Sequence, residues 1–147
     1  MARRTLILVS AALLAGCQAQ PEDQRTAVHK ALRFATLAAV EQRFRQAYGM
    51  LSEDERKRTT EDELEQGIRS QHSRHSTAFP TRVSAIEYSL VPKYDGMRVY
   101  LIGDQRPVPL YYQIAMQRIS GRWYPVGFDA SEQPFPNSGS TRLPAGK

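Results

Sequence analysis

The 147-residue chain contains a single cysteine, Cys17, so it cannot form an internal disulfide. It also lacks an apolar run of the about 20 residues that a bilayer-spanning helix requires. Neither a G-x-S-x-G nucleophile motif nor a phosphate-binding loop occurs. The length suffices for one domain of ordinary size, and its stability must come from packing of side chains.

The charge is only mildly basic. The chain has 20 Lys plus Arg against 15 Asp plus Glu, and Arg3 and Arg4 lie in the first few residues. Without these two the balance is 18 minus 15, or +3. This excess is small and scattered, and it predicts no nucleic-acid partner.

The N-terminus has the three parts of a secretory signal. Arg3 and Arg4 precede the apolar stretch TLILVSAALLA, and the small residue Gly16 stands directly before Cys17. The last four of these residues, Leu14-Ala15-Gly16-Cys17, resemble the lipobox of bacterial lipoproteins. We therefore predict a signal peptide over 1–16, cleaved between Gly16 and Cys17.

The resemblance to lipoproteins implies acylation of Cys17 and a membrane location. Several acyl chains, at about 0.8 kcal/mol per buried CH₂, hold a protein firmly where one chain does not. Gln18 follows the cysteine, and in this class the absence of Asp there favours the outer membrane, facing the periplasm. An ordinary soluble signal followed by a chance cysteine is the alternative.

Helices are expected in the first half of the domain. Apolar residues recur at helical spacing at Phe34, Leu37, Val40, Phe44, Ala47 and Leu51. Since no Gly or Pro interrupts 26–48, one long helix and two helices with a tight bend are both possible. SEDE at 52–55 and TEDE at 60–63 match the capping-box pattern and predict the starts of two further helices.

Strands are expected after Pro80. In TRVSAIEYSLVPKY, residues Ile86, Tyr88 and Leu90 alternate on one face, and Asp95-Gly96 predicts a hairpin into MRVYLIG. LYYQIAMQRI and RWYPVGF follow, joined by Ser120-Gly121, with Tyr124, Val126 and Phe128 alternating in the last strand. This order predicts an α+β domain, with the N-terminal helices packed on a curved antiparallel sheet of about four strands.

Two segments carry a resemblance to a known family. RFRQAYGMLSEDERKRTTEDELEQGI at 43–68 resembles the second helix and following short helix of the nuclear transport factor 2-like superfamily, and YYQIAMQRISGRWYPVGFD at 111–129 resembles its closing hairpin. The resemblance implies a cystatin-like α+β cone with an apolar pocket, and dimerisation through the sheet is common among relatives. It implies no catalytic residue.

The predicted organisation has four parts. A signal peptide (1–16) precedes a lipidated tether (17–25), a cone-like domain (26–129) and a tail (130–147) rich in Pro, Gly and Ser that we expect to be disordered.

Candidate chemistry is sparse. His72 and His75 form an H-x-x-H pair that could hold a metal only if a third ligand converges; a polar helix end is the alternative. Glu87, Tyr88 and Tyr48 are the acid–base candidates of a pocket, with Tyr88 expected in the core and Glu87 facing outwards. We predict no cofactor, no metal and no catalysis.

Aromatic residues gather in the strands. Packing alone explains them in one interpretation, while in the other Tyr100, Tyr111 and Trp123 form an exposed surface for a partner or ligand. The strands also carry scattered arginines that could meet anionic lipid head groups or cell-wall polymer, or discourage aggregation at sheet edges. These are Arg98, Arg106, Arg118 and Arg122.

The sequence therefore predicts a lipid-anchored periplasmic lipoprotein that acts as a non-enzymatic interaction or envelope-assembly module. Its expected partners are the membrane, through the anchor, and an envelope protein or a second copy. A protein that binds a small apolar ligand, or a pocket-based enzyme of the same fold, is the alternative. An interior filled by Phe34, Phe44, Ile114 and Met116 would argue against an enclosed ligand site.

Overall fold

The computed structural model describes residues 22–75, 78–136 and 139–144. The predicted signal peptide, the cleavage site at Gly16 and the lipidation site Cys17 lie outside the described residues.

Helices come first and strands follow. The helical half comprises α1 (Gln24–Ala35), a π-helical turn (Thr36–Val40), α2 (Phe44–Gly49), α3 (Glu53–Arg58) and α4 (Glu61–Arg74). The strands are β1 (Val83–Val91), β2 (Gly96–Gly103), β3 (Tyr111–Ile119), β4 (Arg122–Ser131) and β5 (Thr141–Arg142). The α+β class, with helices packed on an antiparallel sheet, is as predicted.

Of the two possibilities for residues 26–48, one long helix or two helices with a tight bend, the structure has two helices with a break between them. The chain leaves the π-helical turn at Gln42, whose φ is +52°, and α2 begins at Phe44. The predicted starts of the next two helices are confirmed. Ser52 accepts a hydrogen bond from Glu55 N–H, and Thr60 and Glu63 form a complete capping box.

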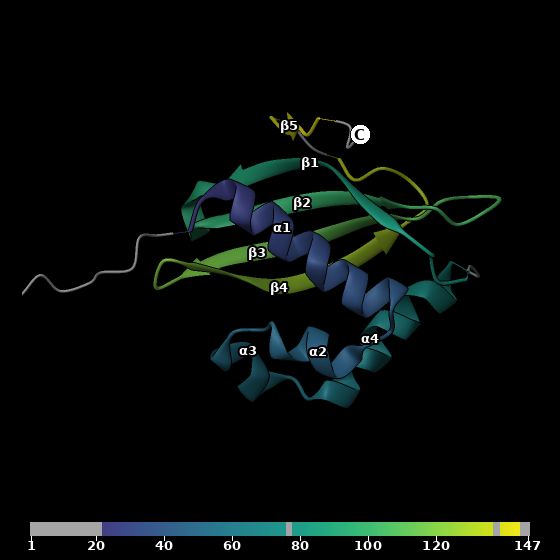
Figure 1. The fold of residues 1–147 in the computed structure, drawn as a ribbon, viewed down its shortest axis with the longest axis horizontal. Helices are drawn as coiled ribbons and strands as arrows, with labels where there is room; N and C mark the ends of the chain where they lie inside the picture. The colour runs from purple at the N-terminus through teal and green to yellow at the C-terminus, as the bar shows by residue number, and fades with distance from the viewer. Residues whose placement is uncertain (1–21, 76–77, 137–138, 145–147) are drawn as a thin grey trace, which may run out of the picture.

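The sheet has one strand more than expected. Its strand order is β4-β3-β2-β1-β5, with every pair antiparallel, and β5 pairs with β1 opposite Glu87 and Tyr88. The disorder predicted for 130–147 is therefore wrong for the end of β4 and for β5. The tail returns across the sheet to the β1 edge, where Leu143 N–H donates to Ile86 O, and this pairing orders it (Figure 1).

Bulges in β1 and β4 change which side chains lie on each face of the sheet, compared with the simple alternation that the sequence predicts. The register of β1 slips at Ile86, and the register of β4 slips at Val126. As a result Trp123 and Pro125 are buried on the side of the helices, rather than Tyr124 and Val126. Leu90, which was expected in the core, is 48% exposed.

The core lies between the helices and one face of the sheet. It contains the aromatic and aliphatic residues Phe34, Phe44, Met97, Leu101, Ile114 and Met116, all almost fully buried. The interior between helix and sheet is thus filled, and the enclosed pocket that the cone resemblance implies is not seen among the described residues. None of the helices there is both long and apolar enough to cross a bilayer.

Candidate functional site

A groove runs along the sheet between α1 and β1. Its volume is about 1170 Å³. Antiparallel α1 and β1 form its two walls, and the chain on the C-terminal side of β5 forms its outer rim (Figure 1). The apolar lining residues are Val28, Leu32, Val83, Ala85, Tyr88, Leu143 and Pro144. Because several of the other lining residues are exposed, the groove is open to solvent along its length.

The charged lining residues lie at the end where α1 begins, whereas the polar residues His29 and Ser84 line the groove farther along. Asp23, Gln24, Arg25 and Arg118 line this end, while Leu32 and Val83 line the other. The Tyr88 hydroxyl donates to Gln24 Oε1 at 3.0 Å and so links the two walls. The groove is therefore charged at the end where α1 begins and mainly apolar at the other end.

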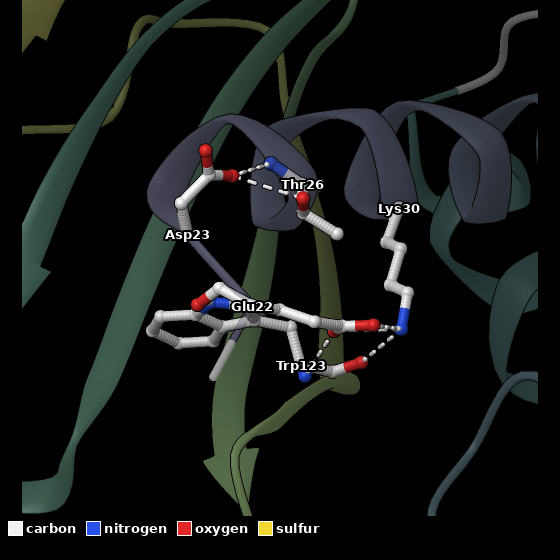
Figure 2. Close-up of polar contacts among 5 residues, drawn as sticks. All are labelled: Glu22, Asp23, Thr26, Lys30 and Trp123. Carbon is white, nitrogen blue, oxygen red and sulfur yellow. Dashed lines mark hydrogen bonds and ion pairs between the residues drawn. The ribbon is translucent and has the colours of Figure 1, made fainter. Parts of the chain in front are cut away.

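Asp23 is the carboxylate of the groove, and it is committed to capping α1. Its Oδ1 accepts hydrogen bonds from Thr26 N–H at 2.8 Å and from Thr26 Oγ1 at 2.9 Å (Figure 2). These bonds lower the pKa of the Asp23 carboxyl. Asp23 is thus ionised at neutral pH, as an N-cap that interacts with the helix dipole should be.

A clamp next to the groove fixes the start of the domain. Glu22 N–H donates to Gly121 O at 2.8 Å, and Trp123 Nε1–H donates to Glu22 O at 3.2 Å. The Glu22 carboxylate accepts from Trp123 N–H at 2.8 Å and from Lys30 Nζ at 2.8 and 2.9 Å (Figure 2). We call Glu22, Lys30 and Trp123 the N-terminal clamp. It joins the predicted tether to the β3–β4 turn.

The pKa of Glu22 reflects this clamp. Burial alone would raise the pKa of its carboxyl, but the hydrogen bonds from Lys30 and from Trp123 N–H, with the nearby positive charges, outweigh burial and lower it. Nothing in the sequence singled out Glu22, because it lies in a polar stretch that is typical of a flexible tether.

His72 and His75 do not form a metal site with a third ligand among the described residues. His72 is buried, with Nδ1 2.9 Å from Ile68 O and Nε2 2.9 Å from the Tyr112 hydroxyl. His75 Nε2 lies 3.1 Å from Ala130 O. The interpretation of both as a polar helix end is wrong for His72, which is buried and whose ring stacks on Phe79.

A buried polar network that the sequence did not reveal surrounds His72. Gln105 Nε2 donates to the Tyr112 hydroxyl at 2.6 Å, and Gln105 Oε1 accepts from Leu110 N–H at 3.2 Å. The arrangement assigns the Tyr112 hydroxyl as donor to His72 Nε2, and His72 Nδ1–H as donor to Ile68 O. Burial lowers the pKa of His72 and raises that of Tyr112 to about 12. Both side chains are neutral and structural.

The predicted aromatic surface is largely buried. Trp123 belongs to the core and the N-terminal clamp, and Tyr100, on the opposite face of the sheet, is covered by the tail residue Phe135 at 6.4 Å between ring centroids. Tyr111 is half-buried. Among the acid–base candidates, Glu87 is bound by Ser140 Oγ and the Tyr48 hydroxyl donates to Arg56 O.

Comparison of the chain with known protein families, with curated proteins and with solved structures gives no match.

Proposed function

We propose that this protein is a lipid-anchored, non-catalytic binding module of the bacterial envelope, and that the groove between α1 and β1 is its ligand site. The observation that carries this proposal is the groove itself, about 1170 Å³ of open, mainly apolar space in a domain whose interior is otherwise filled. Ligand sites are typically concave and mostly apolar, with a few polar groups that fix orientation.

The lining defines the class of ligand. An elongated molecule with a hydrocarbon chain fits walls formed by Leu32, Val83 and Ala85. A polar head fits the other end, where Gln24 and Arg25 line the groove beside Asp23, while the guanidinium of Arg118 is paired with Asp95. We therefore propose a long-chain acyl compound as the ligand.

The electrostatics favour binding over catalysis. A general acid near neutral pH needs a raised carboxyl pKa, whereas hydrogen bonds lower the pKa of Asp23. The groove is also open to water, so it offers no desolvated environment that would activate a weak acid or base.

The anchor and the fold family complete the proposal. Leu14–Cys17 supports acylation of Cys17, and Gln18 supports a location at the outer membrane, facing the periplasm. Helices followed by an antiparallel sheet support a cystatin-like cone of the nuclear transport factor 2-like kind. The intact mass of protein extracted from membranes tests the anchor: we expect a triacylated chain that starts at Cys17, and an unmodified chain would contradict it.

Groove binding is tested with a fluorescent long-chain fatty acid. Ala85→Trp fills the groove from its β1 wall and should reduce the affinity of the purified protein for this probe at least tenfold. Val108→Trp adds the same side chain at an exposed position outside the groove and should leave the affinity unchanged. Equal affinity of both variants and the parent, or no measurable binding by the parent, would contradict the proposed ligand site.

A further inference from the structure

Three segments meet at the end of the molecule where the described chain begins. Arg118 N–H donates to Asp95 O at 3.0 Å, which joins the end of β3 to the β1–β2 connection, and Glu22 N–H donates to Gly121 O in the β3–β4 turn. Figure 1 shows both turns and the start of α1 at the same end of the sheet. We call the exposed residues Arg25, Leu90, Lys93, Tyr94, Arg98 and Arg122 the tether-end surface.

The acidic residues at this end are already engaged. Glu22 binds Lys30 and Trp123 N–H, and Asp23 caps α1. Asp95 forms a two-point ion pair with Arg118, at 2.9 and 3.1 Å. Their charges are therefore compensated within the fold.

The cations of the tether-end surface form no direct ion pairs with the described residues, although Arg122 and Arg25 are close enough to help lower the pKa of the Glu22 and Asp23 carboxyls. Within the described part of the chain, no ion pair involves any of the four exposed cations, which are Arg25, Lys93, Arg98 and Arg122. An excess of positive charge thus projects into solvent at this end.

Apolar side chains accompany these cations. Tyr94, in the β1–β2 connection, is 62% exposed, and Leu90, near the end of β1, is 48% exposed. Lys93 Nζ lies 5.4 Å from the centroid of the Tyr94 ring. Basic residues around an exposed aromatic residue are the combination that binds the interface of an anionic bilayer, because the ring enters the headgroup region while the cations meet phosphate groups.

The length of the tether places this surface against a membrane. If Cys17 is acylated, as proposed above, four residues separate it from Glu22, and the five residue steps between them reach at most about 18 Å when extended. The N-terminal clamp holds Glu22 on the β3–β4 turn, so the anchor emerges beside Arg122 rather than from the far end of the sheet.

We infer that the tether-end surface docks on an anionic phospholipid bilayer and sets the orientation of the domain there. The inference depends on the proposed anchor only for this proximity, because the charge and the exposed apolar residues are properties of the folded domain. Docking places the polar end of the α1–β1 groove at the membrane.

The test compares two tryptophan variants of the processed protein on vesicles. Tyr94→Trp lies on the tether-end surface, whereas Val108→Trp lies in the β2–β3 loop at the opposite end of the sheet. Buried Trp123 is common to both variants. On vesicles of phosphatidylcholine and phosphatidylglycerol that carry brominated lipid, we expect at least twofold stronger quenching of Tyr94→Trp than of Val108→Trp.

Reversing charges on the tether-end surface tests whether its cations orient the domain on the membrane. Lys93→Glu with Arg122→Glu, added to Tyr94→Trp, should remove the excess quenching. Arg82→Glu with Arg106→Glu changes the net charge equally at the opposite end and should preserve it. On vesicles of phosphatidylcholine alone, the excess quenching of Tyr94→Trp should likewise be absent.

The outcomes separate this inference from the proposed function. Equal quenching at both positions, or quenching that ignores the Lys93 and Arg122 charges, would overturn the docking surface even if the mass of the same sample shows an acylated Cys17. If the mass shows no acyl group, the anchor fails, and binding of the sample to added anionic vesicles still decides the docking surface. Binding to isolated cell-wall polymer but not to these vesicles would also overturn it.

Discussion

The two sides of α1 differ in how they are covered. On the side of β4, the helices α2 and α4 pack against the π-helical turn that follows α1, and α4 also contacts β4. The interior there closes around Phe34, whose ring contacts Phe128 at 6.5 Å between centroids. On the side of β1, no further helix lies among the described residues, and the groove remains open.

One helix therefore serves two purposes. Phe34 and Ala31 point into the closed side, while Val28 and Leu32 form a wall of the groove. Because the closed side supplies the packing that a marginally stable domain needs, the open side is free to bind a ligand without disturbing the core. Stability and binding should thus respond to different substitutions on the same helix.

The largest expected effect lies on the closed side. Phe34→Ala should lower the free energy of unfolding by about 3–5 kcal/mol, because it removes a fully buried ring and leaves a cavity. Leu32→Ala, in the half-buried groove wall, is the matched control and should cost clearly less. Urea denaturation measures both, and equal losses would show that the two sides do not differ as the structure indicates.

A pair of tyrosines gives a sharper comparison. Tyr112→Phe should cost about 1–3 kcal/mol, because it leaves buried Gln105 Nε2 and His72 Nε2 without a partner. Tyr88→Phe removes a hydroxyl that bonds Gln24 in the solvent-exposed groove and should change stability by less than about 0.5 kcal/mol. The same denaturation measurement applies, and a larger cost at Tyr88 would reverse our assignment of the two sides.

Local features of the sequence were sufficient to predict the starts of two helices and a tight turn between strands. The N-cap at Ser52 and the capping box at Thr60 begin helices where expected, and Ser120-Gly121, with φ values of +50° and +77°, forms the predicted tight turn. Such signals act within a few residues, so they can be interpreted without knowledge of the tertiary structure.

Features that depend on partners distant in sequence were not predicted. The bulge at Val126 moves Trp123 from a predicted surface to the core, and it exists only through pairing with β3. Likewise, the network of His72 brings together a helix, a loop and a strand. The groove was missed for the same reason, because the pattern of α1 shows which residues are apolar but not which of them remain uncovered.

Titration of His72 should give the smallest and most specific effect. Burial lowers the pKa of His72 in the folded protein below the ordinary value of 6.5, and the nearby His75 adds to this shift. Below pH 6.5 the unfolded chain therefore binds a proton at this position that the folded chain does not. Stability should fall as the pH drops below 6.5, and this loss should end once the pH reaches the folded pKa.

The slope of this loss is bounded by one proton, at most about 1.4 kcal/mol per pH unit. His72→Gln cannot titrate and should remove this contribution to the slope, although it lowers stability at every pH by disturbing the bond to Tyr112. Unfolding free energies from urea titrations between neutral pH and the range where carboxylates protonate measure the difference between the two proteins. If the unfolding free energy of His72→Gln depends on pH as steeply as that of the parent protein, protonation of the His72 ring is not linked to unfolding.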